Sequence, residues 1–248
     1  MSIIDLGKQS LIYGAGHVLA RLITFLLLPL YTHTFTQEEY GALSLAYAFM
    51  GFALILYRYG MDTAMMKYSV QKEGLERKKY ITLIIVTQFI TSFLFTFIIY
   101  FTRLSTAEYV LGTYRPDWIS YLAVILFFDA LWTLPLLILR SEEKAIPYIL
   151  LSLLNVILTM ALNIMFVVYW EQGIEGVFKA NIIASAFIFL VSLPIIIKRI
   201  VFDFFEKDIF LKVIQFALPF LPAGIFTMVM ELSDRYLLEF YLSTAEVG

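Results

Sequence analysis

The chain has 248 residues, of which 61% are hydrophobic and 15% charged, and its formal net charge at pH 7 is −2. This composition is too apolar for a soluble globular protein and predicts a membrane protein. The absence of cysteine excludes disulfides and thiolate sites, and two histidines without metal-ligand spacing argue against a bound metal. We therefore expect no cofactor, and no basic tract predicts binding of nucleic acid.

Seven apolar segments, each near the roughly 20 residues that a helix needs to cross a bilayer, fill almost the whole chain. In chain order they cover residues 11–31, 40–57, 80–101, 118–139, 148–170, 176–197 and 213–230. The first segment is too long for the apolar part of a signal peptide and lacks a small-residue cleavage pattern, so we expect a retained helix. Pro219 and Pro222 interrupt the seventh. The prediction is an all-α, polytopic integral membrane protein.

Lysine and arginine residues are distributed unevenly between the two sides of these segments. The N-terminal tail and the loops on its side hold 13 of them, whereas the loops on the other side hold only Arg103, Arg115 and Lys179. By the positive-inside rule, the N-terminus and the loops 67–79 and 198–212 are expected in the cytoplasm, and residues 102–117 outside.

The end of the chain resembles a segment near its start. Residues 242–248 (LSTAEVG) match residues 35–41 (FTQEEYG) in residue type, and Gly248 aligns with Gly41. Repeated membrane helices are typical of transporters that bind substrate between two halves. Residues 1–200 are thus expected to form an N-terminal lobe of six helices, and residues 201–248 a cytoplasmic linker and the first helix of a truncated second lobe. Such a chain alone is not expected to transport.

Two ionisable residues fall in the middle of predicted spans. Arg21 lies halfway along the first span and Asp129 halfway along the fourth, so both are expected near the centre of the bilayer. An ionisable group at that depth needs a partner or a wet cavity. The two residues could form a static ion pair that fixes helix packing, or they could bind an anionic substrate or couple an ion.

Polar residues recur three or four positions apart in three spans, and so lie on one face of each helix. These stripes comprise Gly14, His17, Arg21 and Thr24 in the first span, Ser44, Tyr47, Gly51, Arg58 and Asp62 in the second, and Ser152, Asn155, Thr159 and Asn163 in the fifth. Stripes of this kind line either helix contacts or a water-filled vestibule. The fifth, which holds only uncharged groups, favours contacts.

The guanidinium groups of Arg21 and Arg58 favour a cavity, because a planar guanidinium matches a phosphate or diphosphate. Arg58 is also expected near the cytoplasmic edge, where it could be a snorkelling anchor. His17 is either a hydrogen-bonded packing residue or a proton relay. The candidate substrate-binding residues are Arg21, Arg58, His17 and Asn155, and the candidates for an ion pair or ion coupling are Asp129 and Asp62.

Catalytic templates are missing from the sequence. It contains no G-x-S-x-G motif, no P-loop, no zinc-protease pattern and no D-x-D pair. We therefore expect no enzymatic activity.

Short motifs spread in order along the chain resemble those of the polysaccharide flippase family, which exports O-antigen and other lipid-linked oligosaccharides. They are residues 28–32 (LPLYT), 38–42 (EEYGA), 59–64 (YGMDTA), 139–145 (LRSEEKA), 173–177 (GIEGV), 218–219 (LP) and 233–236 (SDRY). The family belongs to the multidrug/oligosaccharidyl-lipid/polysaccharide exporter superfamily. The resemblance implies a multidrug-and-toxin-extrusion-like fold with two lobes, of which this chain would be the N-terminal lobe plus a seventh helix.

The resemblance also implies a function. An undecaprenyl-diphosphate-linked oligosaccharide would be flipped across the bacterial inner membrane by alternating access, with Arg21 and Arg58 in the cavity and Asp129 as their counter-charge. The implied partners are this lipid-linked oligosaccharide diphosphate, membrane lipids, a polysaccharide polymerase and glycosyltransferases. The chain departs from the family in having about half its usual length and in lacking the dense arginine pattern of the lipid II flippase. Two alternatives remain. The first is an ion-coupled drug or cation exporter of the same fold, for which acidic cavity residues are expected. The second is an inactive truncated membrane scaffold.

Overall fold

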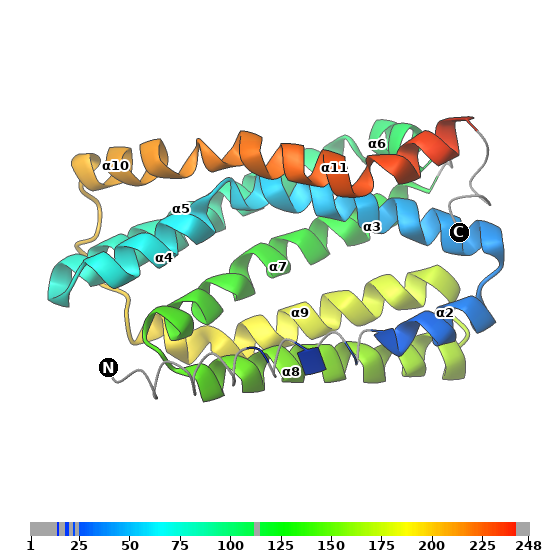
Figure 1. Cartoon of the computed structure of the whole chain (residues 1–248), viewed down its shortest axis with the longest axis horizontal. Helices are drawn as coiled ribbons and strands as arrows, with labels where there is room; N and C mark the ends of the chain where they lie inside the picture. Colours follow the sequence, from blue (N-terminus) through cyan, green and yellow to red (C-terminus); the bar gives the residue numbers. More distant parts are fainter. Residues whose placement is uncertain (1–13, 15–17, 20–21, 23–24, 112–114, 242–248) are drawn as a thin grey trace.

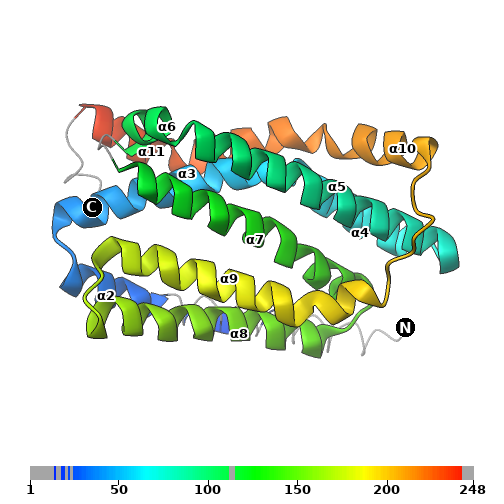
Figure 2. The ribbon, with the colours of Figure 1, turned by 180° about the vertical axis from the view of Figure 1, so that it is seen from behind.

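The computed structural model of the protein describes residues 14, 18–19, 22, 25–111 and 115–241. Long helices lie roughly alongside one another in an elongated bundle (Figures 1 and 2). Within the described residues, six helical segments are long and apolar enough to cross a membrane: Gln37–Arg58, Gly74–Phe101, Pro116–Ser141, Ala145–Tyr169, Gly173–Ile197 and Lys207–Met230. They confirm the second to seventh predicted spans. Most of the first lies outside the described residues, and helix α2 (Leu27–Thr34) covers its end.

Helix α3 (Gln37–Arg58) begins at a capping box. The Thr36 hydroxyl accepts a hydrogen bond from the Glu39 backbone N–H (3.2 Å), and the Glu39 carboxylate accepts one from the Thr36 N–H (2.9 Å). This reciprocal pair satisfies two backbone donors that a helix start leaves open. The Glu39 of the EEYGA motif therefore has a local structural role.

Helix α3 ends at a sharp turn, after which α4 (Met61–Gln71) continues the path. Tyr59 and Gly60 both have positive φ angles, of 32° and 82°. Helix α4 packs against α5 (Gly74–Phe101) and α7 (Pro116–Ser141), so it is part of the bundle (Figure 1). Arg58 is therefore followed by three further helical turns that pack inside the bundle.

Helix α7 is the centre of the bundle. It contacts α9 (Gly173–Ile197), α5, α4 and α3, and its buried residues contribute to each of the apolar clusters of the core. The short helix α6 (Arg103–Leu111), in the segment predicted as an outer loop, packs on α7 and buries Ala107 and Leu111.

Helix α8 (Ala145–Asn163) continues as a π-helix, η1 (Ile164–Tyr169), and buries little of its surface. Its exposed side chains include Ile146, Leu150 and Ile157. In a membrane protein an exposed apolar helix face of this kind is a surface for lipid.

Helices α10 (Lys207–Ala217) and α11 (Phe220–Tyr241) are separated at Leu218 and Pro219, where the sequence predicted an interruption. Helix α10 packs on α4 and α11 packs on α3 (Figure 1). A Cβ atom at Gly60 would lie 2.2 Å from the carbonyl oxygen of Ala217. The interruption between α3 and α4 thus lies directly against the one between α10 and α11. The division of the chain at residue 200 stays a prediction.

Candidate functional site

One face of α3 lines two cavities in series. The first, about 490 Å³, lies between α2, α3, α8 and α9, and the second, about 350 Å³, lies between α3, α4 and α11. The α3 residues that line them are Tyr40, Leu43, Ser44 and Tyr47 for the first cavity, and Gly51, Leu54, Ile55 and Arg58 for the second. These positions are three or four residues apart, so they share one side of the helix. They include four residues of the polar stripe in the second predicted span.

The first cavity is lined by an uncharged polar network. The Asn181 side-chain N–H donates to the Tyr47 hydroxyl (3.3 Å) and to the carbonyl of Val177 (2.8 Å). The Tyr31 hydroxyl donates to Asn163 Oδ1 (2.9 Å), and the phenols of Tyr31 and Tyr47 interact with each other. Helices α2, α3, α8 and α9 each contribute a group. Because these groups hold one another, the wall of the cavity is ordered before any ligand arrives.

The second cavity holds the buried guanidinium of Arg58. Its Nη2 donates to Thr133 Oγ1 (2.9 Å), and this hydroxyl donates to the backbone carbonyl of Asp129 (2.8 Å). Within the part of the chain that the structure describes, Arg58 Nε is buried without a hydrogen-bond partner, and no carboxylate forms an ion pair with the guanidinium. Asp62 and Asp129 act on it only at longer range. Arg58 is therefore an incompletely satisfied cation, a group that an anionic ligand would satisfy.

Asp129 lies between the two cavities. Its Oδ1 accepts hydrogen bonds from Ser185 Oγ (2.6 Å) and Trp132 Nε1 (2.9 Å), which connect α7 to α9. Ser185 is one helical turn beyond Asn181 of the first cavity. Asp129 also lies within electrostatic range of Tyr47 and Arg58, one on the wall of each cavity.

The structure brings some of the predicted site residues together. Arg58 and Asp62 line the second cavity, and Asn155 lines the first. Arg21 and His17 lie outside the described residues, so the pairing of Arg21 with Asp129 stays a prediction.

Sequence analysis did not propose several polar residues of the site, among them Tyr31, Thr133, Asn181 and Ser185. Tyr31 belongs to the LPLYT motif, and the polar residues Asn181 and Ser185, one turn apart in the mainly apolar sixth span, were a usable signal.

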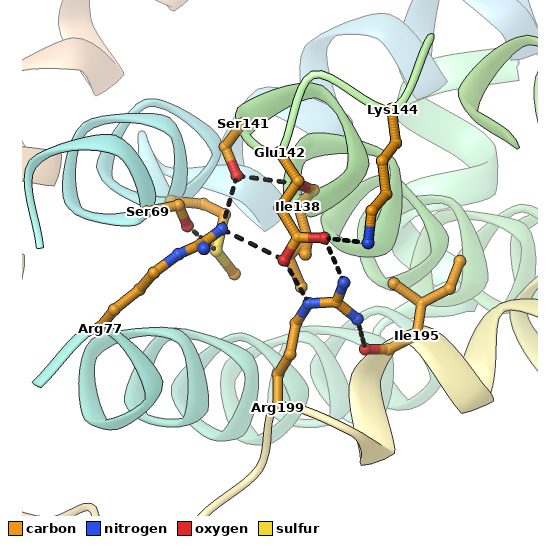
Figure 3. Close-up of polar contacts among 9 residues, drawn as sticks. Ser69, Arg77, Ile138, Ser141, Glu142, Lys144, Ile195 and Arg199 are labelled. Carbon is orange, nitrogen blue, oxygen red and sulfur yellow. Dashed lines mark hydrogen bonds and ion pairs between the residues drawn. The ribbon is translucent and has the colours of Figure 1, made fainter. Parts of the chain in front are cut away.

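A second polar cluster lies where α5 begins and where α7 and α9 end (Figure 3). In this Glu142 cluster, Oε1 accepts from Arg199 Nε (2.6 Å) and Arg77 Nη2 (3.2 Å), and Oε2 binds Arg199 Nη2 and Lys144 Nζ (2.9 Å for Lys144). Burial raises the pKa of Glu142, but the hydrogen bonds and charges of Arg199 and Lys144 outweigh burial and lower it to about 2. Each carboxylate oxygen has two cationic partners, so the cluster joins helices and offers no vacancy for a ligand.

The described helices thus define a multi-pass membrane protein with two cavities along one helix. Comparison with known proteins agrees with this class. The chain belongs to the polysaccharide biosynthesis protein family, whose model matches residues 6–248. It is 26% identical, over 195 residues, to an uncharacterized membrane protein of Haemophilus influenzae, and the match covers 78% of this chain and 45% of that protein.

Several solved structures with the same fold are described as transporters of the MOP superfamily. One is a MOP superfamily transporter from Pyrococcus furiosus whose binding pocket is described as having reverse polarity. The TM-score is 0.72 at 17% sequence identity, and the match covers 96% of this chain and 54% of that chain. Another is a multidrug resistance MATE family transporter in an inward-facing conformation. The TM-score is 0.67 at 16% sequence identity, and the match covers 86% of this chain and 52% of that chain. This likeness confirms the predicted MATE-like fold. The chain spans about half the length of the proteins that it matches.

Proposed function

We propose that the protein takes part in flipping a lipid-linked oligosaccharide diphosphate across the bacterial inner membrane by alternating access. Membership of the polysaccharide biosynthesis protein family supports this proposal. The observation that carries it is the buried guanidinium of Arg58, which lines a cavity and has no ion pair among the described residues. A guanidinium binds a diphosphate through parallel N–H donors, and this binding would remove the cost of the unsatisfied charge.

The surroundings of Arg58 suit the rest of such a substrate. The remaining walls of the second cavity are mainly apolar, with Thr63 and Thr227 as further polar groups. The apolar outer faces of the helices would leave the prenyl chain in the lipid while the diphosphate entered the protein. A bound substrate shifts an inward–outward equilibrium only through its different affinities for the two states, so a gradient must supply the direction of net transport.

Binding of the diphosphate is testable on the purified 248-residue chain. Thermophoresis would compare undecaprenyl diphosphate with undecaprenol, which has the same chain without the phosphates. Arg58→Gln should weaken binding of the diphosphate by about tenfold or more, the effect of losing a charge-assisted hydrogen bond, and leave undecaprenol binding unchanged. Arg140→Gln, at an exposed arginine of α7, is the matched control. Equal affinities for both lipids, or equal losses in the two variants, would remove Arg58 as the diphosphate ligand.

The orientation has its own test, because the chain contains no cysteine. Glu73→Cys and Glu108→Cys introduce single thiols at exposed positions near opposite ends of α5. In intact cells a membrane-impermeant thiol reagent should label the Glu108→Cys variant and spare the Glu73→Cys variant. The reverse labelling would invert the membrane orientation.

One observation favours the alternative of an organic-cation exporter: Asp62 also lines the second cavity. Its carboxylate accepts a hydrogen bond from the Thr63 backbone N–H (2.8 Å) and lies near Arg58, which opposes a cationic ligand. Tetraphenylphosphonium should therefore bind no better to the parent chain than to Asp62→Asn. Cation binding that depends on Asp62 would support the exporter.

A further inference from the structure

We propose that the first cavity is a sugar subsite, which binds a neutral monosaccharide unit of the glycan while the diphosphate occupies the second cavity. Its polar contacts would come from Tyr31, Tyr40, Ser44, Tyr47, Asn155 and Asn181. The inference rests on the proposed function, since it assigns this cavity to another part of the same substrate. Its test, however, requires neither transport nor binding of a diphosphate.

The charge of the cavity selects the class of ligand. Among the described residues that line it, none is Asp, Glu, Lys or Arg. A charged ligand enclosed there would lose its hydration without gaining a counter-charge, which costs several kcal/mol in a low-dielectric site. The volume of about 490 Å³ is within the range of small-molecule sites. The described walls of the cavity therefore favour a neutral occupant.

Among neutral ligands, the residue types that line the first cavity favour a polyol. Three phenol rings supply apolar faces with polar edges, against which the C–H face of a sugar ring can pack. Hydroxyl and carboxamide groups supply both donors and acceptors, which sugar hydroxyls need. The carboxamide of Asn155 has no hydrogen-bond partner within the described part of the chain, so it is open to a ligand.

The spacing of the two cavities fits a single elongated substrate. Tyr47 and Arg58 lie eleven residues apart on the same face of α3, which corresponds to about 17 Å along the helix. A diphosphate held at Arg58 is too short to reach Tyr47. If one molecule occupied both cavities with its diphosphate at Arg58, the polar walls of the first would suit its sugars.

The test uses the absence of native cysteine. Val156 lines the first cavity, so Val156→Cys places a single thiol there. The alkylation rate of the purified chain would be measured in a detergent without a sugar head group. Neutral methyl glycosides of hexoses and N-acetylhexosamines would be added as probes. At least one of these probes should slow alkylation of the thiol, and uncharged tetraethylene glycol of similar size should not.

Two variants in the Val156→Cys background then locate the effect. Asn155→Leu and Asn181→Leu should each weaken protection by about fivefold, the loss expected for one hydrogen bond. Gln215→Leu, which removes a carboxamide from the exposed face of α10, should leave protection unchanged. Thermal unfolding would verify that the variants fold, and Asn155→Gln, which keeps the carboxamide, should protect better than Asn155→Leu.

The inference is overturned if no glycoside protects the thiol, or if both asparagine variants keep the full protection seen in the Val156→Cys parent. It is also overturned if tetraethylene glycol protects equally, because the cavity would then be an unselective apolar space. These outcomes leave the diphosphate test at Arg58 unaffected. Conversely, protection by sugars without binding of undecaprenyl diphosphate would keep the sugar subsite and overturn the proposed lipid-linked substrate.

Discussion

The protein uses arginine and carboxylate side chains in two contrasting ways. In the Glu142 cluster, three cationic side chains surround one carboxylate that is 14% exposed, and both of its oxygens are fully used (Figure 3). Around Arg58, two carboxylates lie within electrostatic range, yet among the described residues neither forms an ion pair with the guanidinium. A buried Nε without a hydrogen-bond partner is common to both regions, since Arg77 has one as well as Arg58. The regions differ in their counter-charge: Arg77 and Arg199 have a carboxylate at hydrogen-bonding distance, and Arg58 has none among the described residues.

This difference separates a structural from a functional use of the same chemistry. A cluster whose charges are paired gains little from a ligand and loses stability when one member is removed. A cation without a paired counter-charge in a low-dielectric site reduces the stability of the empty protein and gains most when an anion arrives. Substitutions in the two regions should therefore have opposite consequences for stability and ligand binding.

The largest effect is expected for Glu142→Gln. Loss of the carboxylate leaves Arg77 and Arg199 close together without their counter-charge, which should cost roughly 3 kcal/mol of unfolding free energy. Denaturation in mixed detergent micelles, monitored by circular dichroism, would measure the loss. Glu143→Gln, at the exposed neighbouring position, is the control and should change stability by less than about 0.5 kcal/mol. Similar values for the two variants would mean that the cluster contributes little.

The pH dependence of stability should also report the contribution of the Glu142 cluster. The pKa of Glu142 is lowered from 4.5 to about 2, so between these values the folded protein binds fewer protons than the unfolded chain. The contribution of Glu142 is therefore fully present above about pH 4.5 and is lost as the pH falls toward 2. The difference in stability between the parent chain and Glu142→Gln should be constant from pH 5 to 8 and shrink below that range. A difference that changed between pH 6 and 8 would point to another titrating group.

A smaller loss is expected where the two helix interruptions meet. Gly60→Ala adds a Cβ at a positive φ angle and 2.2 Å from the Ala217 carbonyl oxygen, whereas Gly74→Ala has a positive φ angle and open space. The first should cost about 2 kcal/mol or more, and the second about 1 kcal/mol from backbone strain alone. Hydrogen exchange should also become faster in α10 for Gly60→Ala only. Equal losses and unchanged exchange would show that the contact with Ala217 adds nothing.

Much of this architecture could be predicted from the sequence, because apolar length reports directly on membrane spans. The interruption at Pro219 was also predictable. The face of α3 that lines both cavities was visible as a stripe of Ser44, Tyr47, Gly51 and Arg58, since helical spacing is a local property.

Long-range contacts could not be predicted in the same way. The second span was predicted to end at residue 57, yet α4 follows it and packs inside the bundle. There the Lys67 ammonium lies over the ring of Phe216, 3.7 Å from its centre. The partners of Asp129, one of which is on α9, depend on which helices are neighbours, and apolar periodicity does not report helix order. The partners of Glu142 come from three parts of the chain, so they could not be predicted for the same reason.

The smallest effect on stability, and the sharpest contrast with Glu142, is expected for Arg58→Met. The guanidinium has one hydrogen bond, to Thr133, and its Nε is unsatisfied among the described residues, so replacement by an apolar side chain should remove as much desolvation cost as favourable interaction. We expect a change in unfolding free energy of less than about 1 kcal/mol, of either sign. The same variant should lose binding of undecaprenyl diphosphate. A loss of stability as large as that of Glu142→Gln, with ligand binding retained, would mean that Arg58 is a packing residue and that the anionic part of the substrate binds elsewhere.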